Sequence, residues 1–336
     1  MNSQKPLAIG IVGAGNMGRN HQGAITRYGA SVVAVHDVRL AAARELVTHT
    51  DGALATTDLD AFFDVEMDGV VITTPPPIRF EPIQMACDRG ISMMVEKPPA
   101  LNMIEGRKCL EAIEKADVIA AVGFQLRYHP LYERLKALIA PETVHLVRTV
   151  CTVNYYLSFS MAPWFLQYEI SGGPLPEQAV HVLDCARFVM GNPKPVQAHA
   201  LAIKNMALDR TEFDAENAIQ MTYQLDNGVF GTHMNHCGTE GFSFEVEVVG
   251  PHLRLHAHMT DNAIRGYLNG EAINESAVSQ NSLGLDKTGA WLRAIETGDR
   301  TLIRSPFADG IQTLALIDAA VQSRDTGRFI NVVELN

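Results

Sequence analysis

The sequence has 336 residues, of which 47% are hydrophobic and 19% are charged. These values are typical of a soluble globular protein, and the length predicts two domains with sizeable cores. The formal net charge of −11 argues against nucleic acid or an anionic membrane surface as a partner.

The sequence shows no membrane-spanning or export signal. No apolar stretch approaches the roughly 18–20 residues that a transmembrane helix needs, and the first residues, MNSQKPLAIG, contain no signal-peptide core. The five cysteines lie far apart without a CxxC pair, which is typical of reduced, buried thiols. We therefore expect a cytoplasmic protein.

The first third of the chain alternates short apolar runs with helical patterns. Runs that are apolar at nearly every position are typical of strands buried on both faces. The predicted strands are Leu7–Val12, Ser31–His36, Gly69–Thr73, Ser92–Val95 and Val118–Val122. The helices predicted between them include Leu40–Thr50, Phe80–Arg89 and Met103–Lys115. This alternation predicts a doubly wound parallel sheet, whose ligands bind beyond the carboxyl ends of the strands.

The first predicted strand runs into GAGNMG, which places Gly13, Gly15 and Gly18 in the GxGxxG spacing. The first glycine permits a tight turn, and the second lets a pyrophosphate approach the backbone. The third lets the next helix pack closely on the strand. The amides at the start of that helix, which include those of Asn16 and Met17, then face the phosphates.

A carboxylate closes the second predicted strand. Asp37 lies nineteen residues after Gly18, where it can accept both ribose hydroxyls of the adenosine. It should repel a 2′-phosphate, so the sequence favours NAD as cofactor. NADP stays open as the alternative, because Arg39 could hold that phosphate.

Four further stretches accompany the glycine motif: TTPPP, VEKPP, VGFQLRYHP and the closing SPFADGIQTLALIDAAVQSRDTGRFINV. Together they resemble the Gfo/Idh/MocA family of NAD(P)-dependent oxidoreductases of sugars, inositols and related polyols, over essentially the whole chain. On these motifs the resemblance adds Thr74, Pro75, Glu96 and Gln125 to the predicted cofactor contacts. We place a Rossmann domain over residues 1–122 and a substrate-binding and oligomerisation domain over residues 123–336.

Long alternating runs dominate the second predicted domain. They predict strands over Val144–Tyr156, Val196–Lys204, Ala218–Leu225, Val229–Cys237, Phe244–Val249 and Leu253–His258. The DNG at 226–228 is a hairpin signal between two of them. We expect an α+β domain with a large, open, mostly antiparallel sheet. The resemblance implies that the exposed face of this sheet joins homodimers or homotetramers.

Helical periodicity from about residue 177 to residue 190 places Glu177, His181 and Asp184 at i, i+4 and i+7, on one helix face. The resemblance to the Gfo/Idh/MocA family implies a histidine on this helix, with a carboxylate four residues before it. The same resemblance implies that this histidine lies beside the lysine of Glu-Lys-Pro. His181 and Lys97 occupy those positions. The sequence departs from the family pattern in having Glu177 for the common Asp, and Arg79 where the loop after TP often carries a histidine.

These residues predict hydride transfer between nicotinamide and a secondary alcohol or ketone. Imidazole, with an ordinary pKa of about 6.5, suits proton transfer near neutral pH, so His181 is the predicted acid–base group. Lys97 would donate a hydrogen bond to the same oxygen, or would itself be the base beside the cationic nicotinamide. Glu177 would shape the site. Glu96 would position Lys97, contact the cofactor or serve simply as an ion-pair partner.

Substrate contacts are predicted for Arg127, Tyr128, Trp164 and Asp184. Arg127 and Tyr128 follow a strand of the first domain and could reach its cleft. Trp164, within APWF, would cover the face of a sugar-like ring or be a core or interface aromatic. Asp184 would bind substrate, support His181 or be a charge on the helix surface.

Several histidines raise the question of a metal, which we do not expect. The histidines of strand 252–258 share one face with Arg254, which would oppose a cation, and the other two point to opposite faces. The residues concerned are His233, His236, His252, His256 and His258.

Two other functions remain open from the sequence. One is redox-assisted glycosidic cleavage, in which NAD stays bound and is regenerated. The other is a regulator that senses the dinucleotide without turnover, although a pure sensor would not need both Lys97 and His181.

Overall fold

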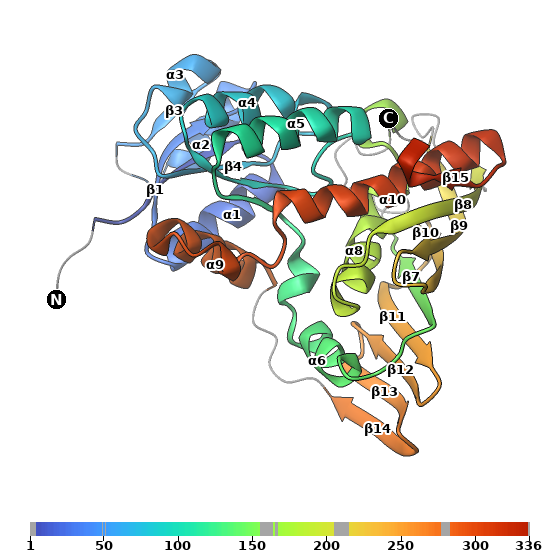
Figure 1. The fold of residues 1–336 in the computed structure, drawn as a ribbon. Coiled ribbons are helices and arrows are strands. Elements are labelled where there is room, and N and C mark those ends of the chain that lie inside the picture. Colours follow the sequence, from blue (N-terminus) through green and yellow to red (C-terminus); the bar gives the residue numbers. More distant parts are fainter. Residues whose placement is uncertain are drawn as a thin grey trace. The chain divides into compact units, whose positions relative to one another are not determined.

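The computed structural model describes residues 5–48, 50, 52–154, 164, 167–204, 215–276 and 283–334 (Figure 1). The chain divides into two compact units. The first comprises residues 1–100, 105–125 and 281–308, and the second comprises residues 101–104, 126–280 and 309–336. The boundary expected at residue 122 lies close to the crossing at residue 125. Residues 281–308, however, return to the first unit, which the sequence did not predict.

The first unit contains a six-stranded parallel sheet with the strand order β3-β2-β1-β4-β5-β6. Its strands are β1 (Ala8–Val12), β2 (Ser31–His36), β3 (Leu54–Thr56), β4 (Gly69–Ile72), β5 (Ser92–Val95) and β6 (Ala120–Val122). Its helical elements are α1 (Asn16–Arg27), α2 (Leu40–Val47), α3 (Leu59–Phe63), η1 (Pro76–Ile78), α4 (Phe80–Asp88), α5 (Met103–Ala116), α9 (Leu283–Thr297) and η5 (Arg300–Leu302). The short helix η2 (Gln125–Tyr128) begins at the crossing, and its last three residues belong to the second unit. This order confirms the predicted doubly wound sheet. Strand β3 was not predicted, because three half-buried residues give no periodic signal.

Helix α9 joins the first unit through its buried face. Trp291 is fully buried, and a Cβ placed on Gly69 would lie 2.9 Å from its indole ring, so the ring rests against the start of β4. The helix also packs on α1, where Tyr28 fills the space beside Gly289. These contacts join opposite ends of the chain, and local sequence patterns carry no information about them.

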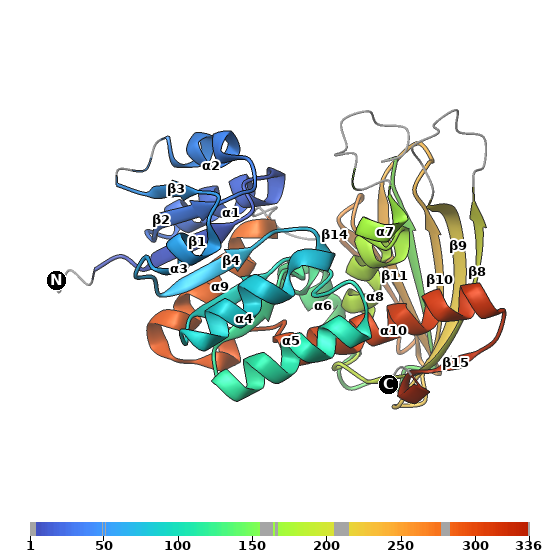
Figure 2. The ribbon, with the colours of Figure 1, turned by 90° about the horizontal axis from the view of Figure 1, so that it is seen from above.

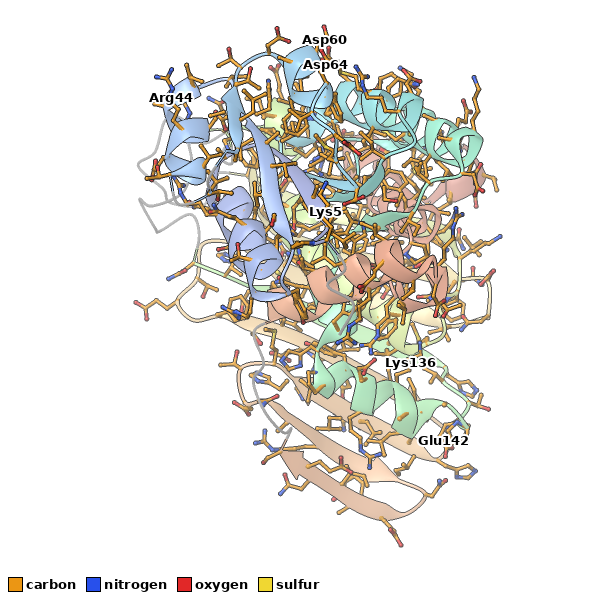
Figure 3. The ribbon with its side chains drawn as sticks, turned by 90° about the vertical axis from the view of Figure 1, so that its left-hand side faces the viewer. Lys5, Arg44, Asp60, Asp64, Lys136 and Glu142 are labelled. Carbon is orange, nitrogen blue, oxygen red and sulfur yellow. The ribbon has the colours of Figure 1, made fainter. Side chains whose placement is uncertain are left out.

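The helices present charged residues outward and apolar residues inward. Arg44 on α2, Asp60 on α3 and Asp64 at the end of α3 all point away from the sheet (Figure 3). Within the described residues, no helix combines the length and the apolar character needed to cross a membrane.

The second unit contains a nine-stranded sheet with the order β14-β13-β12-β11-β7-β10-β9-β8-β15. Its strands are β7 (Leu146–Thr152), β8 (Pro195–Lys204), β9 (Glu216–Leu225), β10 (Phe230–His236), β11 (Ser243–Gly250), β12 (Leu253–His258), β13 (Ala263–Leu268), β14 (Glu271–Ser276) and β15 (Ile330–Asn331). Its helical elements are α6 (Pro130–Ile139), α7 (Tyr168–Ser171), a π-helical turn η4 (Leu175–Ala179), α8 (Val180–Val189), α10 (Phe307–Thr326) and η6 (Val332–Glu334).

The large, mostly antiparallel sheet is confirmed. All its pairings are antiparallel except β10 with β7, and helices α6 and α8 pack on one of its faces (Figure 2). Strands β13 and β14 were not predicted, because few of their residues are buried and little apolar alternation marks them. The predicted extension of β7 to Tyr156 lies outside the described residues.

One histidine of this sheet is buried in the hydrophobic core of the second unit. His233, in the middle of β10, is 1% exposed, and its Nδ1 lies 2.9 Å from the hydroxyl of Thr149 on β7. Burial lowers the pKa of His233 to about 3, and the hydrogen bond with Thr149 offsets only part of that effect. The side chain is therefore neutral in the folded protein at neutral pH.

We expect this histidine to make the second unit sensitive to acid. Below pH 6.5 the unfolded imidazole takes up a proton that the folded one does not, so stability is full above that pH and falls as the pH decreases. Relative to His233→Gln, the wild type should lose about 3 kcal/mol of unfolding free energy between pH 6.5 and pH 4. Urea denaturation at both pH values measures this difference, and equal losses in the two proteins would contradict it.

Candidate active site

The turn between β1 and α1 is fixed to both neighbouring strands. Gly13 has a φ of +102°, and a Cβ there would lie 2.6 Å from the hydroxyl oxygen of Thr73. That hydroxyl donates to the carbonyl oxygen of Gly13 over 2.8 Å, and the Gly13 N–H donates to the carbonyl oxygen of His36 over 2.8 Å. The turn is therefore joined to the ends of β4 and β2.

The other two glycines of the motif differ in their surroundings. A Cβ on Gly18 would lie 2.1 Å from the carbonyl oxygen of Gly13, so glycine is needed for α1 to start this close to the turn. A Cβ on Gly15, by contrast, would meet no atom of the described residues within 4 Å, apart from its chain neighbours. Helix α1 begins at Asn16 with no acidic residue in its first turn, which suits an anion. This open side of the turn fits the diphosphate of a dinucleotide.

Asp37 is held beside the same turn. One oxygen of its carboxylate accepts the N–H of Ala14 over 2.8 Å, and the other accepts the N–H of Arg39 over 2.9 Å. The side chain of Asp37 is 11% exposed, and that of Arg39 is 71% exposed, with its Nε 3.6 Å from the carboxylate. The negative charge is thus fixed at the end of β2, where the sequence expects an adenosine ribose.

The loops that follow β4 and β5 are joined by Arg79. This side chain is 3% exposed, and its Nε donates to the carbonyl oxygen of Thr74 over 2.9 Å. Its other nitrogens donate to the carbonyl oxygens of Glu96, Lys97 and Pro98. The arginine therefore links the TTPPP loop to the VEKPP loop. Hydrogen bonding to backbone carbonyls is a structural role that the sequence did not predict for it.

Glu96 lies inside the first unit, with 3% of its surface exposed. Its Oε1 accepts hydrogen bonds from Nε2 of His21 over 2.8 Å and from Nζ of Lys287 over 2.6 Å, while Oε2 accepts the N–H of Lys97 over 3.1 Å. Of the alternatives that the sequence left open, the ion pair and the contact with the Lys97 backbone are both present. His21 and Lys287 were missed, because His21 lies just outside the glycine motif, three residues after Gly18, and Lys287 belongs to no motif.

The remaining first-unit candidates lie at the carboxyl edge of the sheet or just beyond it. Thr74 and Pro75 follow β4, Lys97 follows β5, and Gln125 follows β6; all four side chains are half-buried. Their placement is consistent with cofactor contacts, which stay predictions.

In the second unit, the predicted continuous helix from residue 177 is interrupted at its start. Glu177 belongs to the π-helical turn, and the α-helix carrying His181 begins only at Val180. Pro176 has no N–H for an α-helical hydrogen bond, which accounts for the wider turn. Glu177 and His181 therefore do not keep ideal α-helical spacing, although both are nearly buried, at 3% and 9% exposure.

An aromatic stack supports the His181 ring. The ring centroids of His181 and Phe244 lie 5.6 Å apart, and those of Phe244 and Phe242 lie 4.6 Å apart. Phe244 is buried and Phe242 is 41% exposed. The imidazole thus packs against an apolar ring on one side.

Arg127 and Asp184 are not placed as the sequence predicted. Arg127 is fully buried, and its guanidinium donates to both carboxylate oxygens of Asp184, over 2.7 and 2.6 Å. Asp309 lies 2.5 Å from Arg127 and 2.8 Å from Arg187, and the Thr313 hydroxyl donates to Asp184 over 2.9 Å. These contacts hold η2, α8 and α10 together. Both side chains are therefore engaged in an ion-pair network inside the second unit, and their predicted contact with substrate stays a prediction.

Tyr128 and Trp164 are the two other residues predicted to contact substrate. Tyr128 is 4% exposed, so it lies largely inside the second unit. Trp164 is half-buried, and its carbonyl oxygen accepts the N–H of Gln167 over 3.2 Å. Their roles toward a substrate stay predictions.

The histidines of β12 engage a carboxylate. Nε2 of His256 lies 2.9 Å from Glu245, and Nε2 of His258 lies 3.4 Å from the same carboxylate. Among the residues that the structure describes, no group of three or more histidine, cysteine or acidic side chains is arranged to hold a metal ion.

Two models of one known protein family match most of the chain. Residues 7–124 match the oxidoreductase family (GFO_IDH_MocA) model for the NAD-binding Rossmann fold, and residues 138–335 match the model for the C-terminal alpha/beta domain of that family. The first unit is thus an NAD-binding Rossmann domain.

Similar proteins include named dehydrogenases. Inositol 2-dehydrogenase of Rhizobium meliloti (strain 1021) is 26% identical over 336 residues, which cover 97% of this chain and 99% of that protein. D-Glucoside 3-dehydrogenase of Escherichia coli (strain K12) is 26% identical over 242 residues, which cover 70% and 69% of the two chains.

Solved structures show the same fold at lower identity. GenD2 from gentamicin A biosynthesis, in complex with NAD, has a TM-score of 0.84 and 21% identity, with 98% of this chain and 97% of that chain covered. Levoglucosan dehydrogenase, in complex with NADH and levoglucosan, has a TM-score of 0.85 and 18% identity, with 98% and 100% covered.

The open side of Gly15 gives a direct test of the dinucleotide site. Gly15 has extended backbone angles (φ −75°, ψ −166°) that alanine also adopts, so Gly15→Ala should fold with an unchanged melting temperature. The added methyl group would occupy the diphosphate side, so NADH affinity should fall by about tenfold or more, a loss of about 1.4 kcal/mol. Fluorescence titration with NADH measures this. Gly23→Ala, which also meets open space but lies further along α1, is the matched control and should bind normally.

Proposed function

Because the chain belongs to the Gfo/Idh/MocA oxidoreductase family, we propose that it transfers a hydride between NAD and a secondary alcohol or ketone of a sugar, cyclitol or related polyol. The observation that carries the proposal is the match of both domains over nearly the whole chain. The sequence resemblance adds Lys97 and His181 as the residues expected to correspond to the family's lysine and histidine. Bound NAD supplies the hydride acceptor or donor.

Lys97 and His181 have separate roles in this proposal. Lys97 donates a hydrogen bond to the reacting oxygen and stabilises negative charge that develops there. Its place directly after β5, with its own N–H bound to Glu96, supports a fixed position at the carboxyl edge of the sheet. His181 takes or returns the hydroxyl proton, and Glu177 shapes the same site. The packing of His181 on Phe244 supports a fixed imidazole plane.

The substrate class rests on relatives that carry the names inositol 2-dehydrogenase and D-glucoside 3-dehydrogenase. Both names point to secondary hydroxyl groups on a six-membered ring. The test is a screen for NADH formation at 340 nm across inositols, aldoses, glucosides, amino sugars and sugar acids. The proposal expects turnover with at least one ring polyol. Protein that is purified with NAD and forms no NADH would instead support redox-assisted glycosidic cleavage or a sensor.

We expect Lys97→Ala and His181→Ala each to lower kcat by about two to four orders of magnitude, because each removes a group that handles the reacting proton or oxygen. Steady-state kinetics with the substrate found in the screen measures the effect, and NADH titration verifies that the cofactor still binds. Lys108→Ala, at an exposed lysine paired with Glu105, is the control and should retain wild-type turnover. Normal kcat in either variant would remove that residue from the mechanism.

The uncovered face of the large sheet supports an assembly of identical chains. Phe230 and Leu146 are 55% and 50% exposed, and they are direct neighbours across β10 and β7. On β8, Leu201 and Ile203 are 64% and 53% exposed. We propose that a second copy of the chain covers this face in a homodimer or homotetramer, because exposed apolar groups at these positions favour contact with another surface.

Light scattering should therefore give a mass of two or four times 36.7 kDa, the mass of one chain. Phe230→Lys places a charge on this face and should shift the protein toward the monomer. Ile104→Lys, at an exposed residue away from the sheet, is the control and should leave the mass unchanged. A wild-type protein that is monomeric at micromolar concentration would contradict the assembly.

A further inference from the structure

We propose that Lys287 and His21 are positioning residues that hold the Lys97 loop in place through the carboxylate of Glu96. The inference rests on the proposed role of Lys97 in the reaction. It concerns two residues that no motif identifies, one from the start of the chain and one from near its end.

The contacts converge on a single side chain. Oε1 of Glu96 accepts from Nζ of Lys287 over 2.6 Å and from Nε2 of His21 over 2.8 Å, and Oε2 accepts the N–H of Lys97 over 3.1 Å. Lys287 and His21 are each 2% exposed, and Glu96 is 3% exposed. One carboxylate thus joins α9 and α1 to the second residue after the end of β5, Lys97.

The carboxylate has little room to move elsewhere. A Cβ on Gly123 would lie 2.7 Å from its Oε1, so a larger residue after β6 would displace it. Nζ of Lys287 also donates to the carbonyl oxygen of Gly123 over 3.4 Å. A shift of Glu96 would therefore disturb its contacts with α1, with α9 and with the residue after β6. The Lys97 N–H would move with it.

The negative charge of Glu96 is balanced by Lys287, and His21 adds a hydrogen bond. Burial raises the pKa of Glu96, but the charge of Lys287 and the hydrogen bond from His21 outweigh it and hold that pKa well below its usual range. Burial and the charge of Lys287 lower the pKa of His21, against the pull of Glu96, so its imidazole is neutral. Nε2–H then donates to Glu96, and Nδ1 is left as acceptor for the Thr288 hydroxyl, 3.5 Å away.

This balance gives the proposal a measurable signature. Lys287→Met removes the cation but keeps much of the side-chain volume. Without the charge of Lys287, the pKa values of both Glu96 and His21 rise, so this hydrogen-bonded pair takes up a proton at lower pH. The proton is shared within the pair and weakens the hydrogen bond that the carboxylate accepts from the Lys97 N–H. Arg79 still binds the Glu96 carbonyl oxygen, and its charge is unchanged in the variant.

The experiment compares kcat of Lys287→Met with that of the wild type from pH 8 to pH 6, as a ratio, so that any pH dependence common to both proteins cancels. The ratio should fall as the Glu96–His21 pair takes up a proton, by up to about tenfold per pH unit for a single proton. In the double variant Glu96→Gln/Lys287→Met, which has no ionisable group at residue 96, the ratio should be independent of pH. Lys108→Met is the matched control, with a ratio near one throughout.

Thermal unfolding and NADH titration accompany each kinetic measurement. The double variant removes both charges and should recover part of any melting temperature lost in Lys287→Met, which keeps the test informative if the single variant is unstable. A ratio that is flat with pH in Lys287→Met, with only the melting temperature lowered, would overturn the inference. Lys97→Ala separates the two proposals, because wild-type activity there contradicts the role of Lys97 itself, whatever Lys287→Met does.

Discussion

Side chains that are buried or half-buried bind the backbone of three loops at the carboxyl edge of the first sheet, and the proposed chemistry depends on this constraint. Thr73 fixes the glycine turn after β1, and Arg79 ties the loop after β4 to the loop after β5. Glu96 adds the N–H of Lys97 to this network. A parallel sheet brings such loops to one edge, and hydrogen bonds to their backbone hold them there without occupying the side that a ligand would approach.

The second unit uses buried charge in a different way. Arg127 binds Asp184 in a bidentate pair and also meets Asp309, so two carboxylates and two arginines lie together at the start of α10. Buried ion pairs of this kind contribute little net stability, but loss of one partner is costly. The arrangement fixes α8, which carries His181 three residues before Asp184. The network thus fixes the helix that carries a proposed catalytic residue. From the sequence, Arg127 and Asp184 were predicted as substrate contacts, with support of His181 as an alternative for Asp184.

This chain shares its fold with the solved structures of similar proteins, whereas the role of Arg79 is a feature of its own sequence. The fold is kept at 18–21% identity to solved structures with TM-scores of 0.84 and 0.85. Arg79 occupies a loop position at which the resembled family often has histidine, and here its guanidinium bonds to backbone carbonyl oxygens. An arginine with these bonds determines the conformation of the loops after β4 and β5. Any effect of Arg79 on substrate choice would therefore be indirect.

The sequence by itself determined the parallel sheet, the glycine turn, Asp37 after β2 and the antiparallel sheet, because each has a local period or a fixed spacing. Only the tertiary structure decided that Lys287 and His21 meet Glu96, that Trp291 belongs with β4, and that Arg127 is an internal ion-pair partner. It also decided the π-helical turn at Glu177. These features depend on contacts between distant segments and on burial, and an isolated charged residue in a sequence looks the same whether its partner is water or a carboxylate far along the chain.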